Sequence, residues 1–536
     1  MSTNISKEKR DALISKINAI KKYILSHSQD ENALNLLSYT NEIENELRAK
    51  RFGLVFEEHL EKIDEVLSNH LPYLKEEEKL FIDNGGEMNF LIEGDNLASL
   101  NLLLKTHKGK IDLIYIDPPY NTGNKDFIYD DNFVDSTDTF RHSKWLSFME
   151  KRLRLARKLL SENGVIFISI DDNEQAELKL LCDSVFREAN FVADLIWQNK
   201  YTIANDKTNG LSTQTEHILC YCTNSNNISF TSAPLREEYI KSTYKNPDND
   251  PNGAWRTVQM FKYKNPKSFT VVSPTGKTWE RPWNFTPESF KELDEKGCVY
   301  WGKDGNSCPT KKVYLKDSKG TGRRNLLLGE EVGFTANSSA ELKEIFEATD
   351  IFQYSKPSTL IAYLIQMCEH SSTVLDFFAG SGTTGHAVMK LNQEDGGKRK
   401  FILCTNNENN IARDVCYERI KRVVNKEKYE ASLKYFKVDY LSISDKLYYE
   451  YADELLKHVR ELVELENGIN FKGNSEIAII LTEDELDEFT KTIPPSCKKI
   501  YLGHDILLSL DQQQKLKKRN IQINIIPDYY YNEESI

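Results

Sequence analysis

The stretch Ile111-Asp112-Leu113-Ile114-Tyr115-Ile116-Asp117-Pro118-Pro119-Tyr120 decides how this chain folds. Its apolar beginning predicts a buried strand, which must end at the consecutive prolines because proline lacks an N–H donor. In a doubly wound α/β sheet, ligands and chemistry lie at the carboxyl ends of the strands. The sequence therefore places Asp117 and Tyr120 at a candidate site. The alternative interpretation is a Pro-Pro turn that only closes a core strand.

The residues from Asp117 to Tyr120 suit an exocyclic amine on a flat ring. The prolines leave a stiff rim of carbonyl acceptors, Asp117 adds a carboxylate, and Tyr120 adds an aromatic face. A carboxylate and the Pro118 carbonyl can accept both hydrogens of an –NH2 group while the tyrosine stacks on the heterocycle. We interpret Asp117, Pro118, Pro119 and Tyr120 as candidate catalytic residues.

A second motif lies far downstream, where a predicted strand leads through Gly380, Gly382 and Gly385 into a helix. This GxGxxG spacing lets a loop pass close to a nucleotide-like ligand and opens a helix N-terminus towards it. The next predicted strand, 400–405, ends near Glu408, which could bind ribose hydroxyls. A nicotinamide-dependent dehydrogenase would show the same pieces, but it normally carries them near the start of its fold.

Taken in this order, the Asp-Pro-Pro-Tyr and Phe-Ala-Gly-Ser-Gly motifs resemble those of the beta class of DNA amino-methyltransferases, which use S-adenosylmethionine. Leu91–Leu97 resembles the family segment just upstream of the catalytic strand, and its Asp95-Asn96 pair matches positions that meet the cofactor's adenine edge. Phe352–Pro357 resembles the family's aromatic-Pro-Lys-Pro segment, whose lysine lies by the methionine carboxylate, with Ser355 in place of the first proline. The cofactor residues that this resemblance implies are Asp95, Asn96, Asp117, Lys356, Asp376, Phe378, Gly380, Gly382, Thr383, Thr384 and Glu408.

A narrower resemblance, to the modification (Mod) subunits of type III restriction systems, spans roughly residues 85–440. It is carried by Val272–Lys277, Trp279, Phe290–Gly305, Pro309–Lys312, Val332–Thr335 and Ala340–Lys343, and by the tail Ile526–Asn532. The resemblance implies sequence-specific methylation of the N6 amino group of a flipped adenine in double-stranded DNA. It also implies a homodimer and a possible restriction (Res) subunit as partner.

Besides the nicotinamide-dependent enzyme, two other functions remain open. Cytosine N4 also presents an –NH2 group on a flat ring, although serine is more usual there in place of Asp117. A non-catalytic DNA-binding subunit could keep a degenerate methyltransferase fold, but the intact Asp117, Tyr120, Gly380 and Gly382 argue against decay.

Alternating strands and helices predict an α/β fold with a Rossmann-like doubly wound parallel sheet. The predicted strands are 88–93, 111–116, 164–170, 191–198, 373–377 and 400–405, and the predicted helices are 96–107, 144–161 and 173–187. We predict five regions: a helical N-terminal arm (1–80), the catalytic half of the methyltransferase domain (81–225), a target-recognition insertion (226–335), the cofactor-binding half (336–440) and a small C-terminal α/β domain (441–536). In the last region a helix over 447–465 precedes three short strands.

Composition excludes several classes of protein. The chain has nine cysteines, which is an odd number. Cys220 and Cys222 are separated by one residue, so they do not form a Cys-x-x-Cys motif. Neither a disulfide framework nor a zinc site is therefore indicated. No metal is predicted for the chemistry. Nowhere do about 18 apolar residues run together, as a membrane helix requires. We expect a soluble, cytoplasmic protein.

Basic charge gathers in one window of this acidic chain. The net charge is −12, yet residues 241–330 hold 17 Lys and Arg against 10 Asp and Glu. The same window contains the aromatic residues Tyr244, Trp255, Phe261, Tyr263, Phe269, Trp279, Trp283 and Tyr300. This mixture suits phosphate contacts and base stacking, so we predict that the window binds DNA. A solvated, loop-rich insertion is the alternative.

The predicted helix after Tyr120 is also basic, with Arg141, Lys144, Lys151, Arg152, Arg154, Arg157 and Lys158. These side chains could follow phosphates beside a flipped base. We favour the solvated face of a helix whose apolar residues pack on the sheet.

Overall fold

A computed structural model describes residues 5–26, 33–48, 56–123, 127–129, 132–202, 211–262, 268–349, 351–368, 372–442, 455–503 and 505–526. Most of the predicted tail motif, the first half of the predicted helix 447–465 and Tyr263 lie outside these residues.

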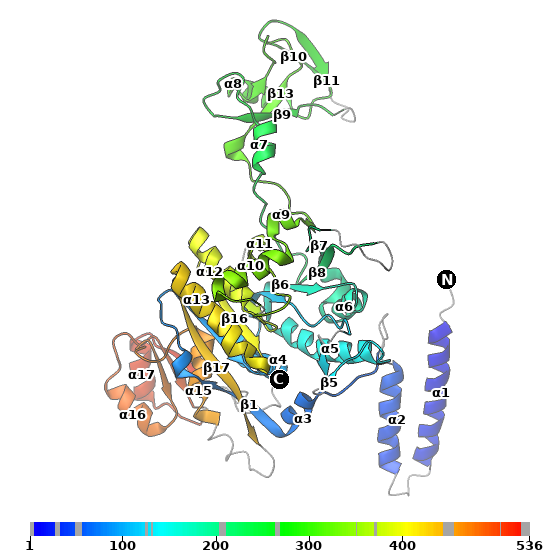
Figure 1. Cartoon of the computed structure of the whole chain (residues 1–536), viewed down its shortest axis with the longest axis vertical. Coiled ribbons are helices and arrows are strands. Elements are labelled where there is room, and N and C mark those ends of the chain that lie inside the picture. Colours follow the sequence, from blue (N-terminus) through cyan, green and yellow to red (C-terminus); the bar gives the residue numbers. More distant parts are fainter. Residues whose placement is uncertain are drawn as a thin grey trace.

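A ten-stranded mixed sheet forms the centre of the molecule (Figure 1). In spatial order its strands are β1 (His70–Glu76), β17 (Ala431–Ser442), β2 (Glu87–Glu93), β16 (Lys400–Thr405), β15 (Thr373–Asp376), β3 (Ile111–Ile116), β6 (Leu160–Ile170), β8 (Thr215–Cys222), β7 (Phe191–Gln198) and β14 (Leu326–Leu327). β15 and β3 pair in parallel, with Val374 opposite Leu113. The carboxyl ends of two strands far apart in the sequence therefore lie side by side.

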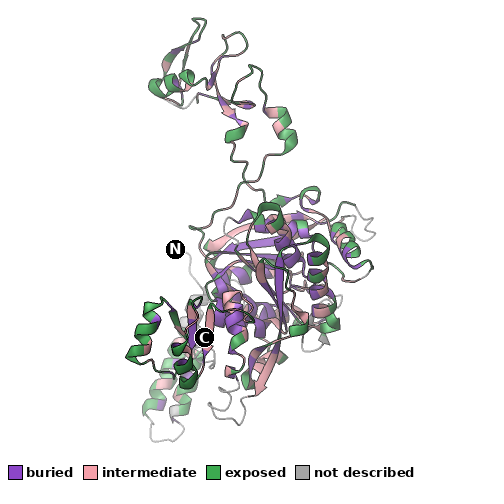
Figure 2. Ribbon diagram, turned by 90° about the vertical axis from the view of Figure 1, so that its left-hand side faces the viewer, coloured by how far each residue is buried: buried purple, intermediate pink, exposed green. Residues whose placement is uncertain are grey.

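Helices cover both faces of the sheet, which confirms the predicted α/β class. Alternate residues of β3 enter different cores, because successive side chains of a strand point to opposite faces. Ile114 and Ile116 belong to the core under α4 (Asn96–His107), α5 (Arg141–Leu159) and α6 (Gln175–Cys182). Leu113 and Tyr115 belong to the core under α10 (Thr335–Phe346), α11 (Ser358–Met367), α12 (Thr383–Asp395) and α13 (Glu418–Glu427). Figure 2 shows this buried centre.

The prediction of a parallel sheet was wrong in part. β8 runs antiparallel to both β6 and β7, and β1 runs antiparallel to β17. β1 falls within residues 1–80, for which only helices were predicted. Its sequence contains Pro72, which an edge strand tolerates because a missing N–H faces no second partner there. The region assigned to the helical arm therefore also supplies an edge of the central sheet.

The other regions carry shorter elements. Before β1 lie α1 (Ile5–Ser26), α2 (Ala33–Arg48) and α3 (Lys62–Asn69). Near the sheet lie β4 (Ile128–Tyr129), β5 (Asn132–Phe133) and α9 (Gly329–Val332). Short 3-10 and π turns are η1 (Glu78–Leu80), η2 (Asp183–Arg187), η3 (Glu188–Asn190), η4 (Leu315–Asp317), η5 (Glu408–Asn410) and η6 (Ile411–Tyr417). After β17 come α15 (Val459–Asn467), β18 (Ile477–Ile480), α16 (Glu483–Lys491), β19 (Lys499–Leu502), α17 (Leu510–Lys518) and β20 (Gln522–Ile525). The three strands β18, β19 and β20 form a small parallel sheet.

The insertion projects away from the central sheet (Figures 1 and 2). Its elements are α7 (Glu237–Thr243), β9 (Trp255–Gln259), β10 (Phe269–Val272), β11 (Thr278–Arg281), α8 (Pro287–Glu295), β12 (Val299–Tyr300) and β13 (Thr310–Tyr314). It has its own small core, centred on Trp283 and Phe290. Tyr244, Trp255 and Trp283 are 6%, 4% and 1% exposed, so their predicted availability for base stacking was wrong: they hold the insertion together.

Within the described part of the chain, no helix is both long and apolar enough to cross a membrane.

A buried ion pair joins the central sheet to the C-terminal region. The ammonium of Lys434, on β17, lies 2.6 Å from Glu464 of α15 and 2.9 Å from Glu76 of β1. The side chains of Lys434 and Glu464 are both 0% exposed. Because isolated buried charges are strongly disfavoured, each side chain depends on the other.

We predict that Lys434→Met destabilises the protein, because Glu464 and Glu76 then keep only the more distant guanidinium of Arg460, which lies 3.4 Å from Glu464 and 3.9 Å from Glu76. Removing one partner of a buried pair costs about 3–5 kcal/mol, which thermal unfolding would detect as a lower midpoint. Lys421→Met, which removes a half-exposed lysine on α13, is the control and should leave the midpoint nearly unchanged. Equal midpoints for both variants would contradict the prediction.

Candidate functional site

The segment from Asp117 to Tyr120 begins where β3 ends. The hydroxyl of Tyr120 donates to Asp117 Oδ1 at 2.9 Å. The indole Nε1 of Trp145, on α5, donates to the Pro119 carbonyl at 2.7 Å. Two hydrogen bonds thus fix the predicted segment: Tyr120 binds Asp117 within it, and Trp145 of α5 binds the Pro119 carbonyl.

Lys356 binds the carboxylate of Asp117. Its Nζ lies 2.8 Å from both Oδ1 and Oδ2, and it also donates to the Tyr120 hydroxyl at 2.8 Å. The second carboxylate of this cluster is Glu216, on β8, whose Oε2 lies 3.2 Å from the Tyr120 hydroxyl oxygen and 3.5 Å from Lys356 Nζ. The lysine that the family resemblance places beside a cofactor carboxylate therefore lies between two protein carboxylates here.

Burial governs the protonation of this cluster. It raises the pKa of Asp117 above its ordinary value, although the Lys356 ammonium opposes the rise. Burial acts against the charged form of Lys356, but Asp117 and Glu216 outweigh it and raise the pKa of the ammonium. Burial and the same two carboxylates raise the pKa of Tyr120 well above its ordinary value. Lys356 therefore stays an ammonium and Tyr120 a neutral donor.

Asn121 anchors the other end of the segment. It is 0% exposed and has a φ of 57°, a left-handed conformation that asparagine tolerates better than most residues. Its amide donates to Glu174 Oε1 at 2.5 Å and to the Arg141 carbonyl at 3.2 Å. The His142 ring lies 2.7 Å from the same Glu174 oxygen. Burial raises the pKa of Glu174 to about 8, so its carboxyl group is largely protonated at neutral pH.

The glycine loop after β15 is shaped by Asp376. One carboxylate oxygen accepts from the Phe378 N–H at 3.0 Å and the other accepts from the Thr384 hydroxyl at 2.6 Å. Gly382 has a φ of 76°, and a Cβ there would come within 3.1 Å of Cys416 Sγ. The loop thus needs glycine both for its backbone conformation and for its close packing.

Arg419 ties the glycine loop to the segment of Lys356. Its guanidinium, fully buried on α13, donates to Thr383 at 2.8 Å and pairs with Glu341 at 2.8 Å. Glu341 in turn accepts from the backbone N–H of Ser358 at 3.4 Å, two residues after Lys356. His386 is buried within hydrogen-bonding distance of Arg419.

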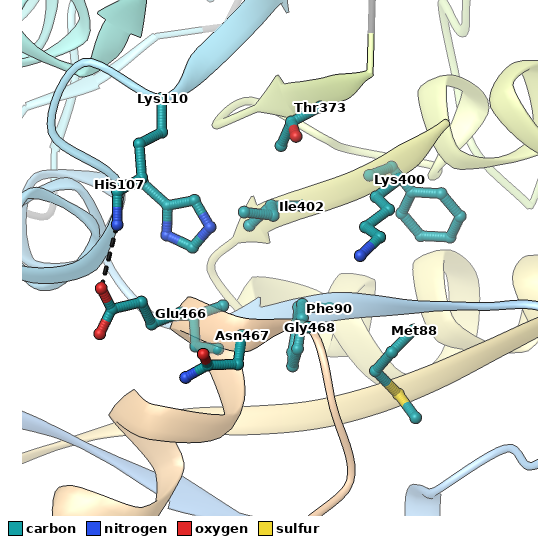
Figure 3. A pocket seen from close by; sticks show the side chains of 12 residues that line it. Met88, Phe90, His107, Lys110, Thr373, Lys400, Ile402, Glu466, Asn467 and Gly468 are labelled. Atoms are coloured by element: carbon teal, nitrogen blue, oxygen red, sulfur yellow. Dashed lines mark hydrogen bonds and ion pairs between the residues drawn. The ribbon is translucent and has the colours of Figure 1, made fainter. Parts of the chain in front are cut away.

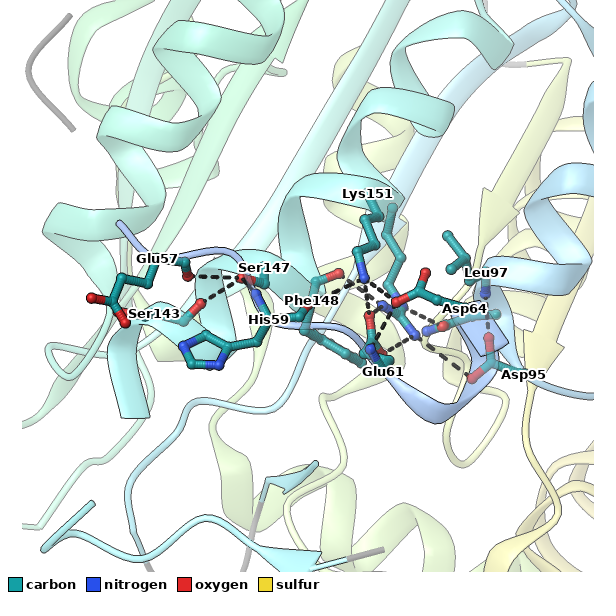
Figure 4. A network of polar contacts seen from close by, with 12 residues as sticks. Glu57, His59, Glu61, Asp64, Asp95, Leu97, Ser143, Ser147, Phe148 and Lys151 are labelled. Carbon is teal, nitrogen blue, oxygen red and sulfur yellow. Dashed lines mark hydrogen bonds and ion pairs between the residues drawn. The ribbon is translucent and has the colours of Figure 1, made fainter. Parts of the chain in front are cut away.

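Asp95 and Asn96 belong to a polar network that reaches the segment before α3 (Figure 4). Asp95 caps α4 by accepting from the Leu97 N–H at 2.7 Å. Asn96 donates to the Phe377 carbonyl, beside the glycine loop, at 3.2 Å. Arg152 binds Asn96 and also pairs with Glu61 at 2.8 Å.

Arg152 has only 1% of its side chain exposed. The expectation that it belongs to the solvated face of a basic helix was therefore wrong. Its guanidinium lies 3.7 Å from the centre of the Phe148 ring, and the Phe148 ring lies 5.8 Å from that of Phe378. These contacts align α5 with the glycine loop.

Glu408 begins η5 directly beyond β16 and is exposed. Its strand neighbours β15 in the sheet, so the predicted acidic residue stands at the same edge as the glycine loop. A cavity of about 140 Å³ lies at the other edge, where β2, β15 and β16 begin (Figure 3). It is lined in part by His107, Lys110 and Lys400, and it is separate from the candidate site.

Sequence reasoning missed three residues of the site, Glu216, Glu174 and Arg419, and it placed Arg152 wrongly on a solvated face. Glu174 follows Asp171-Asp172-Asn173 at the end of a correctly predicted strand, so an acidic cluster at a strand end was a usable signal. Glu216 lies on β8, which was not predicted. The two arginines stand among exposed lysines and arginines of similar spacing, and only burial distinguishes them.

Comparisons with known proteins bear on this arrangement. A family model described as DNA methylase matches residues 111–456. The chain is 38% identical over 378 residues to the type III restriction-modification enzyme StyLTI Mod subunit of Salmonella typhimurium, which covers 65% of this chain and 57% of that subunit. It is 32% identical over 387 residues to the EcoP15I Mod subunit of Escherichia coli, covering 60% and 58% respectively. It is 32% identical over 348 residues to the type II methyltransferase M.KpnI of Klebsiella pneumoniae, covering 59% and 79%. The chain thus spans less than two thirds of the length of the two Mod subunits.

We predict that Glu174→Gln stabilises the protein at pH 8 but not at pH 4. The ordinary carboxyl pKa is 4.5 and the folded value is about 8, so the wild-type protein loses stability as the pH rises through this window. The neutral amide avoids that loss. Thermal midpoints should therefore diverge by a few degrees between pH 4.5 and 8. Glu162→Gln, which changes an exposed glutamate on β6, is the control, and a difference independent of pH would refute the assignment.

Proposed function

Because the chain belongs to the DNA methylase family, we propose that it transfers a methyl group from S-adenosylmethionine to the N6 amino group of adenine in DNA. The observation that carries the proposal is the parallel pairing of β3 with β15, since it sets Asp117 beside the glycine loop. We further propose that the chain is the modification subunit of a restriction-modification system. The similarity to two Mod subunits supports this role.

The proposed chemistry depends on two hydrogen-bond acceptors for the N6 amine of adenine. Conjugation with the ring makes the adenine amine a poor nucleophile. Asp117 and the Pro118 carbonyl would accept its two hydrogens, which draws the nitrogen towards tetrahedral geometry and orients its lone pair. Asp117 would also stabilise the positive charge that the nitrogen acquires. When bound, S-adenosylmethionine supplies an electrophilic methyl group on its sulfonium sulfur.

Adenine must leave the DNA stack to reach Asp117, at a cost of a few kcal/mol. In the proposal, the Tyr120 ring offsets part of that cost by stacking on the flipped base. Its hydroxyl is bonded to Asp117, and the Pro119 carbonyl is fixed by Trp145, so both the aromatic face and the carbonyl rim are held in place before substrate arrives. Such preorganisation reduces the reorganisation needed in the transition state.

The glycine loop fits the proposed cofactor. Gly380 has a φ of 48°, and a Cβ there would come within 3.2 Å of the Phe352 ring, so this position of the loop has little room for a side chain. Gly382 caps α12 and turns the first N–H groups of that helix towards the loop. In the proposal, these two glycines with Asp376, Phe378, Thr383 and Thr384 hold the cofactor, Asp95 and Asn96 meet its adenine edge, and Glu408 binds its ribose.

Lys356 is assigned differently from the other proposed cofactor residues. The family resemblance implies that Lys356 lies beside the methionine carboxylate of the cofactor, but in this structure both Asp117 oxygens lie 2.8 Å from its ammonium. The observed contacts support a role for Lys356 at the proposed catalytic carboxylate.

We propose that the insertion binds double-stranded DNA through phosphate contacts. Its aromatic residues are largely committed to its own core, but Lys262, Lys277, Arg281 and Lys303 are exposed. Such contacts position a protein on DNA without reading its sequence. A homodimer and a separate Res subunit complete the proposal. Light scattering that shows only a monomer of 62.0 kDa would remove the homodimer.

Mass spectrometry of nucleosides tests the proposed function. Unmethylated DNA of varied sequence is incubated with the protein and S-adenosylmethionine, then digested. N6-methyladenine is the expected product. N4-methylcytosine would keep the fold and overturn the base assignment, and the absence of any methylated base would contradict catalysis by this chain alone.

We predict that Asp117→Ala abolishes N6-methyladenine formation, because only one acceptor then remains for the amine. Calorimetry should show that the variant still binds S-adenosylmethionine, since Asp376 and the glycine loop are untouched. Asp172→Asn, which removes an exposed carboxylate near His217, is the matched control and should stay active. A fully active Asp117→Ala variant would refute the role of Asp117.

We predict that Glu408→Gln weakens S-adenosylmethionine binding about tenfold, the loss expected for one charge-assisted hydrogen bond. The turnover rate at saturating cofactor should change little, because Glu408 lies at β16 and not at Asp117. Glu418→Gln, on the outer helix α13, serves as the control. Unchanged cofactor affinity in Glu408→Gln would remove Glu408 from the proposed site.

A further inference from the structure

We propose that Glu216 is a positioning residue that takes the Lys356 ammonium from Asp117 when the adenine amine binds. This inference rests on the proposed function, because it concerns the same carboxylate. It adds a residue from β8, the strand beyond β6 in the sheet, to a site otherwise built at the ends of β3 and β15.

Asp117 is occupied in the structure. Lys356 Nζ lies 2.8 Å from each of its oxygens, and Tyr120 donates to Oδ1 as well. These three bonds take both lone-pair sites of Oδ1 and one of Oδ2, so an amine that donates to Asp117 must share Oδ2 with the Lys356 ammonium. The ammonium would also repel the positive charge that methylation creates on the amine nitrogen, because like charges a few ångströms apart interact strongly at a partly buried site. A shift of Lys356 away from Asp117 would relieve both the crowding and the repulsion.

Glu216 is placed to receive the ammonium. Its Oε2 lies 3.5 Å from Lys356 Nζ, only slightly beyond a hydrogen bond. Its Oε1 accepts from the Asn199 amide at 2.7 Å, which holds the carboxylate with the other oxygen towards Lys356 and Tyr120. A small displacement of Nζ is therefore enough to exchange one carboxylate for the other.

Solvent is a poor alternative destination for Lys356. Its side chain is only 7% exposed, and a buried ammonium needs an acceptor for its N–H groups. The two carboxylates keep its pKa raised, so the group does not escape by losing its proton. Exchange between Asp117 and Glu216 leaves the total charge of the site unchanged. Substrate binding then needs no proton transfer to free Asp117.

The experiment measures methylation by the full-length Glu216→Gln variant with DNA and saturating S-adenosylmethionine. The amide cannot neutralise the ammonium, so Lys356 stays on Asp117 and kcat should fall about tenfold or more. The KM for DNA and the Kd for S-adenosylmethionine should stay within about twofold of wild type, because phosphate contacts and the glycine loop are intact. Glu216→Asp, which keeps the charge, should recover part of the rate. Asp172→Asn is the matched control and should retain wild-type kcat.

A double variant separates exchange from simple support of the fold. Adding Lys356→Met to Glu216→Gln removes the competing ammonium, so the double variant should turn over faster than Glu216→Gln alone. A merely structural Glu216 predicts that the second change only adds damage. Wild-type kcat in Glu216→Gln, or a double variant no faster than the single one, overturns the inference. Wild-type protein that methylates no base would instead refute the proposed function.

Discussion

The parallel pairing of β3 with β15 is the constraint on which the rest of the structure depends. It joins a strand that precedes the insertion to one that follows it, so that Asp117 and Asp376 stand at neighbouring strand ends. The two carboxyl groups are close enough for Asp117 to add to the effect of burial, which raises the pKa of Asp376 to about 7. Hydrogen bonds from Thr384 and the Phe378 backbone oppose that rise and fix the glycine loop. An insertion can project from this frame without disturbing it, because both strand ends are held by the sheet.

Buried charges are organised around this edge in pairs. Asp117 and Glu216 share Lys356, Glu341 pairs with Arg419, and Glu61 pairs with Arg152. Lys356 joins the end of β3 to β8, Arg419 joins α13 to α10, and Arg152 joins α5 to the segment before α3. Because breaking such a pair leaves an uncompensated buried charge, the pairs specify geometry more than they add stability. The loops of the site are therefore positioned by ion pairs between residues that are far apart in the sequence.

Local patterns predicted the central elements well and the non-local contacts poorly. The bounds of β3, β7, β16 and α4 agree with the predicted ranges, because apolar runs end at proline, glycine or polar residues that mark strand and helix ends. β1, β8 and β17 were missed, since an edge strand or an antiparallel strand is defined by its partner and not by its own pattern. Glu216 was missed for the same reason. The tryptophans of the insertion show the converse error, because composition does not reveal whether an aromatic ring faces solvent or a small core.

The central claim is that Asp117 and its neighbours methylate the amino group of adenine at a defined DNA sequence. Single-molecule sequencing of DNA from cells that express the full-length chain, compared with cells that lack it, tests this most directly. We expect N6-methyladenine at one recurrent sequence in the expressing cells and none there in the others. N4-methylcytosine at a recurrent sequence, or identical methylation in both DNA samples, would contradict the claim.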